Sequence, residues 1–119
     1  MSSVVDAMRR FISTSPGVRG VVLATWDGLE YASVGEVADA PSISAASSVV
    51  LSTARRASEI TGAGEPIDAA VFCEGGTLYF RVVGDEFILC IFGDIVVSDV
   101  FRAEVRLLAR RLERALGKS

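Results

Sequence analysis

The stretch from residue 68 to residue 97 constrains the fold most strongly, because it holds three strand-length segments separated by glycine turns. The segments read DAAVFCEGG, TLYFRVVGDE and FILCIFGDIVV, and each is rich in the β-branched and aromatic residues that favour strands. Gly75-Gly76 and Gly84-Asp85 can supply the positive φ angles of tight hairpins. The three segments are therefore predicted to pair as an antiparallel meander.

The last segment of this meander is apolar on both of its faces. Its two alternating sets of side chains are Phe87, Leu89 and Ile91 on one face and Ile88, Cys90 and Phe92 on the other. A sheet with one face in water would alternate apolar and polar residues. We therefore expect this sheet to be covered on both faces.

The preceding chain supplies one helix, one hairpin and a second helix. A helix is predicted over residues 4–13, with Ser3 as its N-cap and Asp6 in its first turn. Its apolar stripe is Val4, Val5, Met8, Phe11 and Ile12. The runs VRGVVLAT and LEYASVG, joined by Asp27-Gly28, predict a hairpin whose second arm is a sheet edge.

The second helix is predicted from Pro41 to about residue 61 and is rich in serine and alanine. The side chains expected to face the sheet are Ile43, Ala46, Val50, Ala54, Ala57 and Ile60. The small residues on its other side either allow close approach of another helix or simply reflect a close-packed helix on a sheet.

A closing helix is predicted from a cap at Ser98 or Asp99 to about residue 116. Its buried face is expected to be Phe101, Val105, Leu108, Leu112 and Ala115. Arginines recur at i, i+4 steps: Arg102, Arg106, Arg110 and Arg114. This row is either a solvated face or a contact stripe for an acidic surface.

These elements predict one α+β sandwich domain over residues 1–119, built on a five-stranded antiparallel sheet of order 2-1-5-4-3. The middle helix should cover one face and the two terminal helices the other. One sheet edge is then the segment from residue 68, which carries no Lys or Pro over residues 69–73. An apolar edge without such residues can pair with another strand, so this edge predicts a symmetric homodimer.

Composition excludes several classes of function. The chain has no histidine, which removes the commonest general base and metal ligand. Cys73 and Cys90 lie in predicted strands and are expected to be reduced core residues, with a redox pair as the alternative. No phosphate-binding or metal-ligand motif occurs, and Asp85, Glu86 and Asp94 are expected to be solvated turn residues. We therefore expect no catalysis, cofactor or metal.

Charge and hydropathy bound the partners and location. The net charge of −3 argues against nucleic acid as a partner. The chain contains no uncharged apolar run long enough to predict a membrane span, and no secretory signal is visible. A cytoplasmic location is therefore expected.

The segments GVRGVVLATWDGLEYASVG and AAVFCEGGTLYFRVVGDEFILCIFG, with the long small-residue helix between them, resemble the roadblock / dynein light chain family. The resemblance spans nearly the whole chain and is strongest to bacterial and archaeal regulators of Ras-like GTPases. It implies a fold related to longin and profilin-like domains, and a homodimer through residues 42–61 and 68–74. The implied interface residues are Ser47, Val50, Leu51, Ala54, Ala69, Val71 and Cys73.

The resemblance also implies a function without catalytic residues. Members bind small GTPases, and some stimulate GTP hydrolysis by positioning the GTPase's own groups. The residues implied to contact such a partner are Ser44, Ser48, Arg55, Arg56 and Glu59. The alternative is a dimeric scaffold subunit of a larger signalling or motility complex without GTPase activation.

Overall fold

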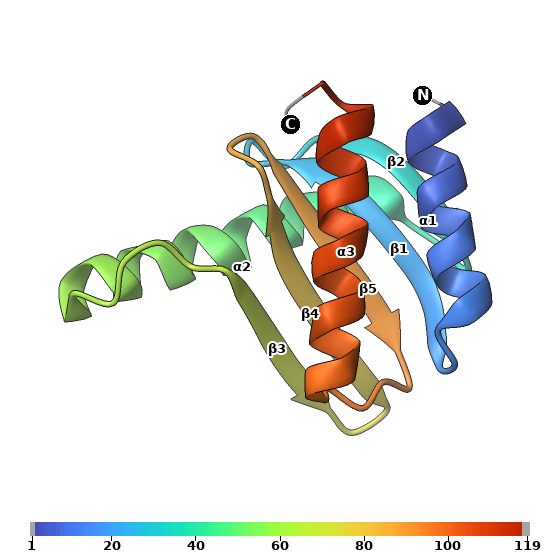
Figure 1. The fold of residues 1–119 in the computed structure, drawn as a ribbon. Helices are drawn as coiled ribbons and strands as arrows, with labels where there is room; N and C mark the ends of the chain where they lie inside the picture. The colour runs from blue at the N-terminus through green and yellow to red at the C-terminus, as the bar shows by residue number, and fades with distance from the viewer. Residues whose placement is uncertain (1, 118–119) are drawn as a thin grey trace.

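The computed structural model describes residues 2–117, and its elements follow the predicted order (Figure 1). They are α1 (Ser2–Thr14), β1 (Val18–Thr25), β2 (Glu30–Gly35), α2 (Ala40–Thr61), β3 (Asp68–Cys73), β4 (Gly76–Val83), β5 (Phe87–Gly93) and α3 (Asp99–Ala115). All strand pairs are antiparallel, and the sheet order β2-β1-β5-β4-β3 confirms the prediction.

The sheet is covered on both faces, as the pattern of β5 predicts. Helices α1 and α3 lie side by side on one face, and α2 crosses the other (Figure 1). Leu89 and Ile91 are fully buried in the core beneath α1 and α3, whereas Ile88 and Cys90 are buried beneath α2. Strand β5 therefore sits at the centre of the fold with both faces in contact with helices.

Helix α2 covers the sheet unevenly. It packs on β1, β5 and β2, and its C-terminal half projects past the β3 side of the sheet (Figure 1). Asp39 caps its start, with the Ser42 amide donating to Oδ1 at 3.2 Å, and Gly62 ends it with φ of 73°. Pro41 lies in the first turn as predicted.

The ends of several elements differ from the predictions. Helix α1 begins at Ser2, so Ser3 lies inside it, and its first turn holds no acidic residue; the predicted cap and the place of Asp6 are wrong. Strand β5 ends at Gly93 instead of continuing to residue 97, because the Gly17 carbonyl approaches the Gly93 backbone and accepts the Asp94 amide at 2.9 Å.

The closing helix follows its predicted cap and most of its predicted face. The Ser98 hydroxyl accepts the Phe101 amide at 3.1 Å, which confirms Ser98 as the N-cap. Of the five side chains expected inside, Ala115 alone is exposed, because the neighbouring Leu116 packs against the core in its place.

Candidate functional site

Three different faces run along α2, and only one of them contacts the sheet. The buried residues are Ser44, Ser47 and Leu51, with Ile43, Val50 and Ala54 half-buried beside them. Ala46, Ala57 and Ile60, which were expected to face the sheet, are exposed instead. The expectation was wrong because α2 has small or apolar residues on several sides, so its sequence does not single out one buried stripe.

The exposed apolar residues of α2 form a row, which we call the outer stripe. Its members recur at three- and four-residue steps and carry no charge: Ala46, Val49, Thr53, Ala57 and Ile60. Residues at these steps share one helix face. Val49 and Ile60 expose 65% and 71% of their surface. A face of this kind allows another helix to pack closely against α2.

Strand β3 is a sheet edge that is apolar and exposed, like the outer stripe of α2. It pairs with β4 alone and presents Val71, Phe72 and Cys73 to solvent, with Phe72 71% exposed. The preceding Ile67 and the neighbouring Leu78 on β4 add to this exposed apolar surface. An edge without Lys, Pro or a bulge can accept a further strand.

The predicted interface residues separate into three groups by accessibility. Val71 and Cys73 are exposed, and Val50, Ala54 and Ala69 are half-buried against the core beneath α2. Ser47 and Leu51 are 1% and 0% exposed because they point into the sheet of their own protomer, so they do not line a protomer surface. Phe72, the most exposed large apolar residue of β3, was omitted from the prediction although its place in the apolar edge could have indicated it.

The predicted partner-binding residues also differ in accessibility. Ser44 is fully buried and cannot reach a partner from within the folded protomer. The Ser48 hydroxyl is half-buried and donates to the Trp26 carbonyl. Arg56 and Glu59 are both exposed: Arg56 borders the outer stripe, whereas Glu59 lies further round the helix.

Arg55 is held within the protomer. Its guanidinium lies 3.9 Å from the centre of the Trp26 ring and 3.1 Å from the Glu65 carboxylate. These contacts also explain the position of Trp26, which packs beside the β1–β2 turn. Arg55 therefore stabilises the end of the sheet, and Arg56 and Glu59 remain the accessible charged residues of the predicted set.

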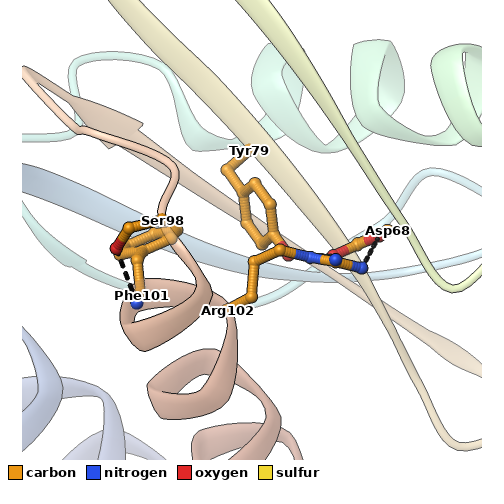
Figure 2. A network of polar contacts seen from close by, with 5 residues as sticks. All are labelled: Asp68, Tyr79, Ser98, Phe101 and Arg102. Carbon is orange, nitrogen blue, oxygen red and sulfur yellow. Dashed lines mark hydrogen bonds and ion pairs between the residues drawn. The ribbon is translucent and has the colours of Figure 1, made fainter.

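A polar network fastens β3 to α3 (Figure 2). Arg102 donates from Nε and Nη2 to the two carboxylate oxygens of Asp68 at 2.8 and 3.0 Å, and the Tyr79 hydroxyl donates to the same carboxylate. Burial would raise the pKa of Asp68, but the bonds from Arg102 and Tyr79 outweigh it and lower that pKa. Burial, together with the bond to Asp68, raises the pKa of Tyr79 to about 12.

This network uses the one charged side chain of β3 and one arginine of the predicted row on α3. Asp68 is ion-paired, so it places no free charge at the edge. The edge strand is held in position while its apolar residues stay exposed, which suits a preformed contact surface.

The two cysteines occupy different environments. Cys90 is buried beneath α2, and burial raises the pKa of its thiol to about 11. Cys73 is a free, exposed thiol, so its predicted core location is wrong. The reason is that α2 lies mainly over β1, β5 and β2 and leaves this end of β3 uncovered.

Residues 2–117 contain no group of three or more potential metal ligands among His, Cys, Asp and Glu. In the same part of the chain, no helix has the length and apolar character needed to cross a membrane.

The fold and its exposed edge define an α+β domain with a surface suited to protein contacts. The family model of the Roadblock/LC7 domain matches residues 5–92, and the chain belongs to that family. A comparison with curated proteins found no match.

Several solved structures share this fold. A Roadblock/LC7 domain from Streptomyces avermitilis superposes with a TM-score of 0.86 at 23% identity, covering 94% of this chain and 96% of that one. MglB from Myxococcus xanthus gives 0.88 at 16% identity, covering 98% and 89%. An MglB with a tetrameric arrangement gives 0.85 at 12% identity, covering 95% and 87%. At these identities the likeness establishes the fold alone.

Proposed function

We propose that two copies of this chain associate through the β3 edge and the outer stripe of α2, and that the dimer binds a small Ras-like GTPase. The observation that carries the proposal is that two exposed surfaces occur on one side of the molecule: an apolar edge strand, and an uncharged face of the helix that projects past it (Figure 1). Both are typical of surfaces that pack against a second copy. Structural similarity to MglB, one form of which has a tetrameric arrangement, supports self-association.

The exposed surface of α2 suits two different partners. The outer stripe is uncharged and fits a second α2, whereas Arg56 at the border of the stripe and Glu59 further round the helix carry charge. In a symmetric dimer the α2 helices of both protomers would meet at the interface. The paired helices would then offer a surface with charged residues from both copies, to which the GTPase binds.

The first experiment measures solution mass, and the second measures binding to candidate Ras-like GTPases of the same organism. Each GTPase is loaded with GDP or a non-hydrolysable GTP analogue and titrated by biolayer interferometry, and single-turnover GTP hydrolysis is followed with and without the purified protein. Nucleotide-dependent binding by a dimer supports the proposal. A dimer that shows neither such binding nor a changed rate favours the scaffold alternative instead.

Charge-reversal variants test whether the GTPase contacts α2. Arg56→Glu should weaken GTPase binding, because it replaces an exposed cation on α2 with an anion. Arg9→Glu is the matched control, since Arg9 is equally exposed but lies on α1, on the opposite face of the sheet. Equal effects of the two changes would show that net charge, not a contact on α2, governs binding.

A further inference from the structure

The charge of this protein is unevenly distributed between the helices α1 and α3 and the rest of the chain. Helices α1 and α3 carry seven arginines and four carboxylates, a net charge of +3. The whole chain has a net charge of −3, so the remaining residues carry −6. Because α1 and α3 form one layer (Figure 1), this layer is the basic side of an acidic protein.

A groove runs along this basic layer between the two helices. It consists of two adjoining hollows of about 220 and 470 Å³ that share Arg10 and Arg111 as lining residues. The first hollow is also lined by Phe11, Leu107 and Leu108, and Leu107 is 45% exposed. The groove thus combines an apolar floor with walls in which three arginines, Arg10, Arg111 and Arg114, outnumber two carboxylates, Asp6 and Glu104.

Within residues 2–117 the arginines of the groove have no carboxylate partner. The two ion pairs among residues 2–117 engage Arg55 and Arg102. Arg10, Arg111 and Arg114 therefore have no ion pair in the described part of the chain, although they line hollows that also include acidic residues. Unpaired guanidinium groups beside exposed apolar surface can bind carboxylates bidentately.

We propose that this groove is a second docking site, and that its occupant is an acidic amphipathic helix of another protein. The lining residues of α1 extend from Ser3 to Thr14, which corresponds to about 17 Å, or roughly three helical turns. A helix of that length can place leucine side chains on Leu107 and Phe11 and carboxylates beside Arg10 and Arg111. A concave groove of this length fits a helix better than it fits a flat bilayer surface.

The test uses a synthetic probe peptide of about 15 residues, EELLEALEELLEALE with both ends blocked, which matches the groove in length and has one apolar face. Isotope-labelled protein is titrated with this peptide and followed by ¹H–¹⁵N correlation spectra. We expect shift changes confined to α1 and α3, and weaker binding as the salt concentration rises. The same peptide with every Glu replaced by Lys should not bind.

Variants separate a groove contact from general attraction. Arg111→Glu should weaken binding of the probe about tenfold, because it removes an attractive contact and adds a repulsive one. Arg56→Glu makes the same charge change on α2 and should leave binding unaltered. Circular dichroism confirms that both variants remain folded.

Three results would overturn the proposal: no binding of the acidic probe, equal weakening by the two variants, or binding to vesicles containing phosphatidylserine with no binding of the peptide. The last result would assign the basic layer to a membrane surface. If Arg111→Glu loses probe binding while its solution mass is unchanged, the groove is distinct from the proposed dimer interface at β3 and α2.

Discussion

Replacing Phe72 by serine is the most direct single-residue test of the proposed dimer interface. Phe72 is 71% exposed at the end of β3, and a phenylalanine has roughly 200 Å² of surface, so about 140 Å² is in water in the protomer. If a second copy covers that surface, its burial contributes about 3.5 kcal/mol per protomer at 25 cal/mol per Å². A symmetric interface contains the residue twice.

The measurable effect is smaller than this sum, because association also costs translational, rotational and side-chain entropy and does not convert area into affinity directly. We expect Phe72→Ser to weaken dimerisation by at least about 2.7 kcal/mol, which is a hundredfold in Kd. Sedimentation equilibrium over a wide range of protein concentration measures that change.

Leu29→Ser is the matched control, because Leu29 is 65% exposed but lies in the β1–β2 turn, away from β3. It should leave the Kd unchanged. A Phe72→Ser variant that dimerises as tightly as the wild-type protein, or a wild-type protein that is a monomer at every concentration tested, would contradict the proposed interface.

Three further predictions concern the edge strand and its attachment. Val71→Lys should give a monomer by light scattering, because it places a charge on the edge strand. The thermal unfolding temperature should change little, because the Val71 side chain is 40% exposed in the protomer. A variant that remains dimeric would show that the dimer interface lies elsewhere. Tyr79→Phe removes the hydroxyl that bonds Asp68 and should lower the free energy of unfolding, measured in urea, by about 1.5 kcal/mol. Tyr31→Phe is the control and should be nearly neutral, because the Tyr31 ring packs on Phe87 and its hydroxyl makes no hydrogen bond in the described part of the chain. Equal losses in the two variants would contradict the network. Because the pKa of Asp68 is lowered on folding, its contribution is fully present above the unfolded pKa of about 4 and is lost as the pH falls through the lower folded-state pKa. Asp68→Asn should therefore flatten the dependence of the urea midpoint on pH in the acid range, and an unchanged slope would show that other carboxylates dominate.

Much of the fold follows from local pattern. The alternation along residues 87–92 predicted two covered faces, and the glycine-containing turns of the meander predicted antiparallel neighbours; both are confirmed. The buried stripe of α1 was predicted because Val4, Met8 and Phe11 recur at helical spacing with charged residues between them.

Helix α2 shows where local pattern fails. Small and apolar residues surround it on several sides, so periodicity could not distinguish the face that contacts the sheet from the outer stripe. The burial of Ser44, Ser47 and Leu51 depends instead on the angle at which the helix crosses β1 and β5. The same crossing angle leaves Cys73 exposed, against its prediction.

The sequence by itself determined the elements, the hairpin pairs and the apolar character of the edge strand, because these depend on residues that are close together in the chain. Tertiary structure alone decided which residues of α2 and β3 remain exposed, that Arg102 pairs with Asp68 across 34 residues, and that Arg10 and Arg111 line one groove. These features depend on the packing of distant elements, for which no local period carries information.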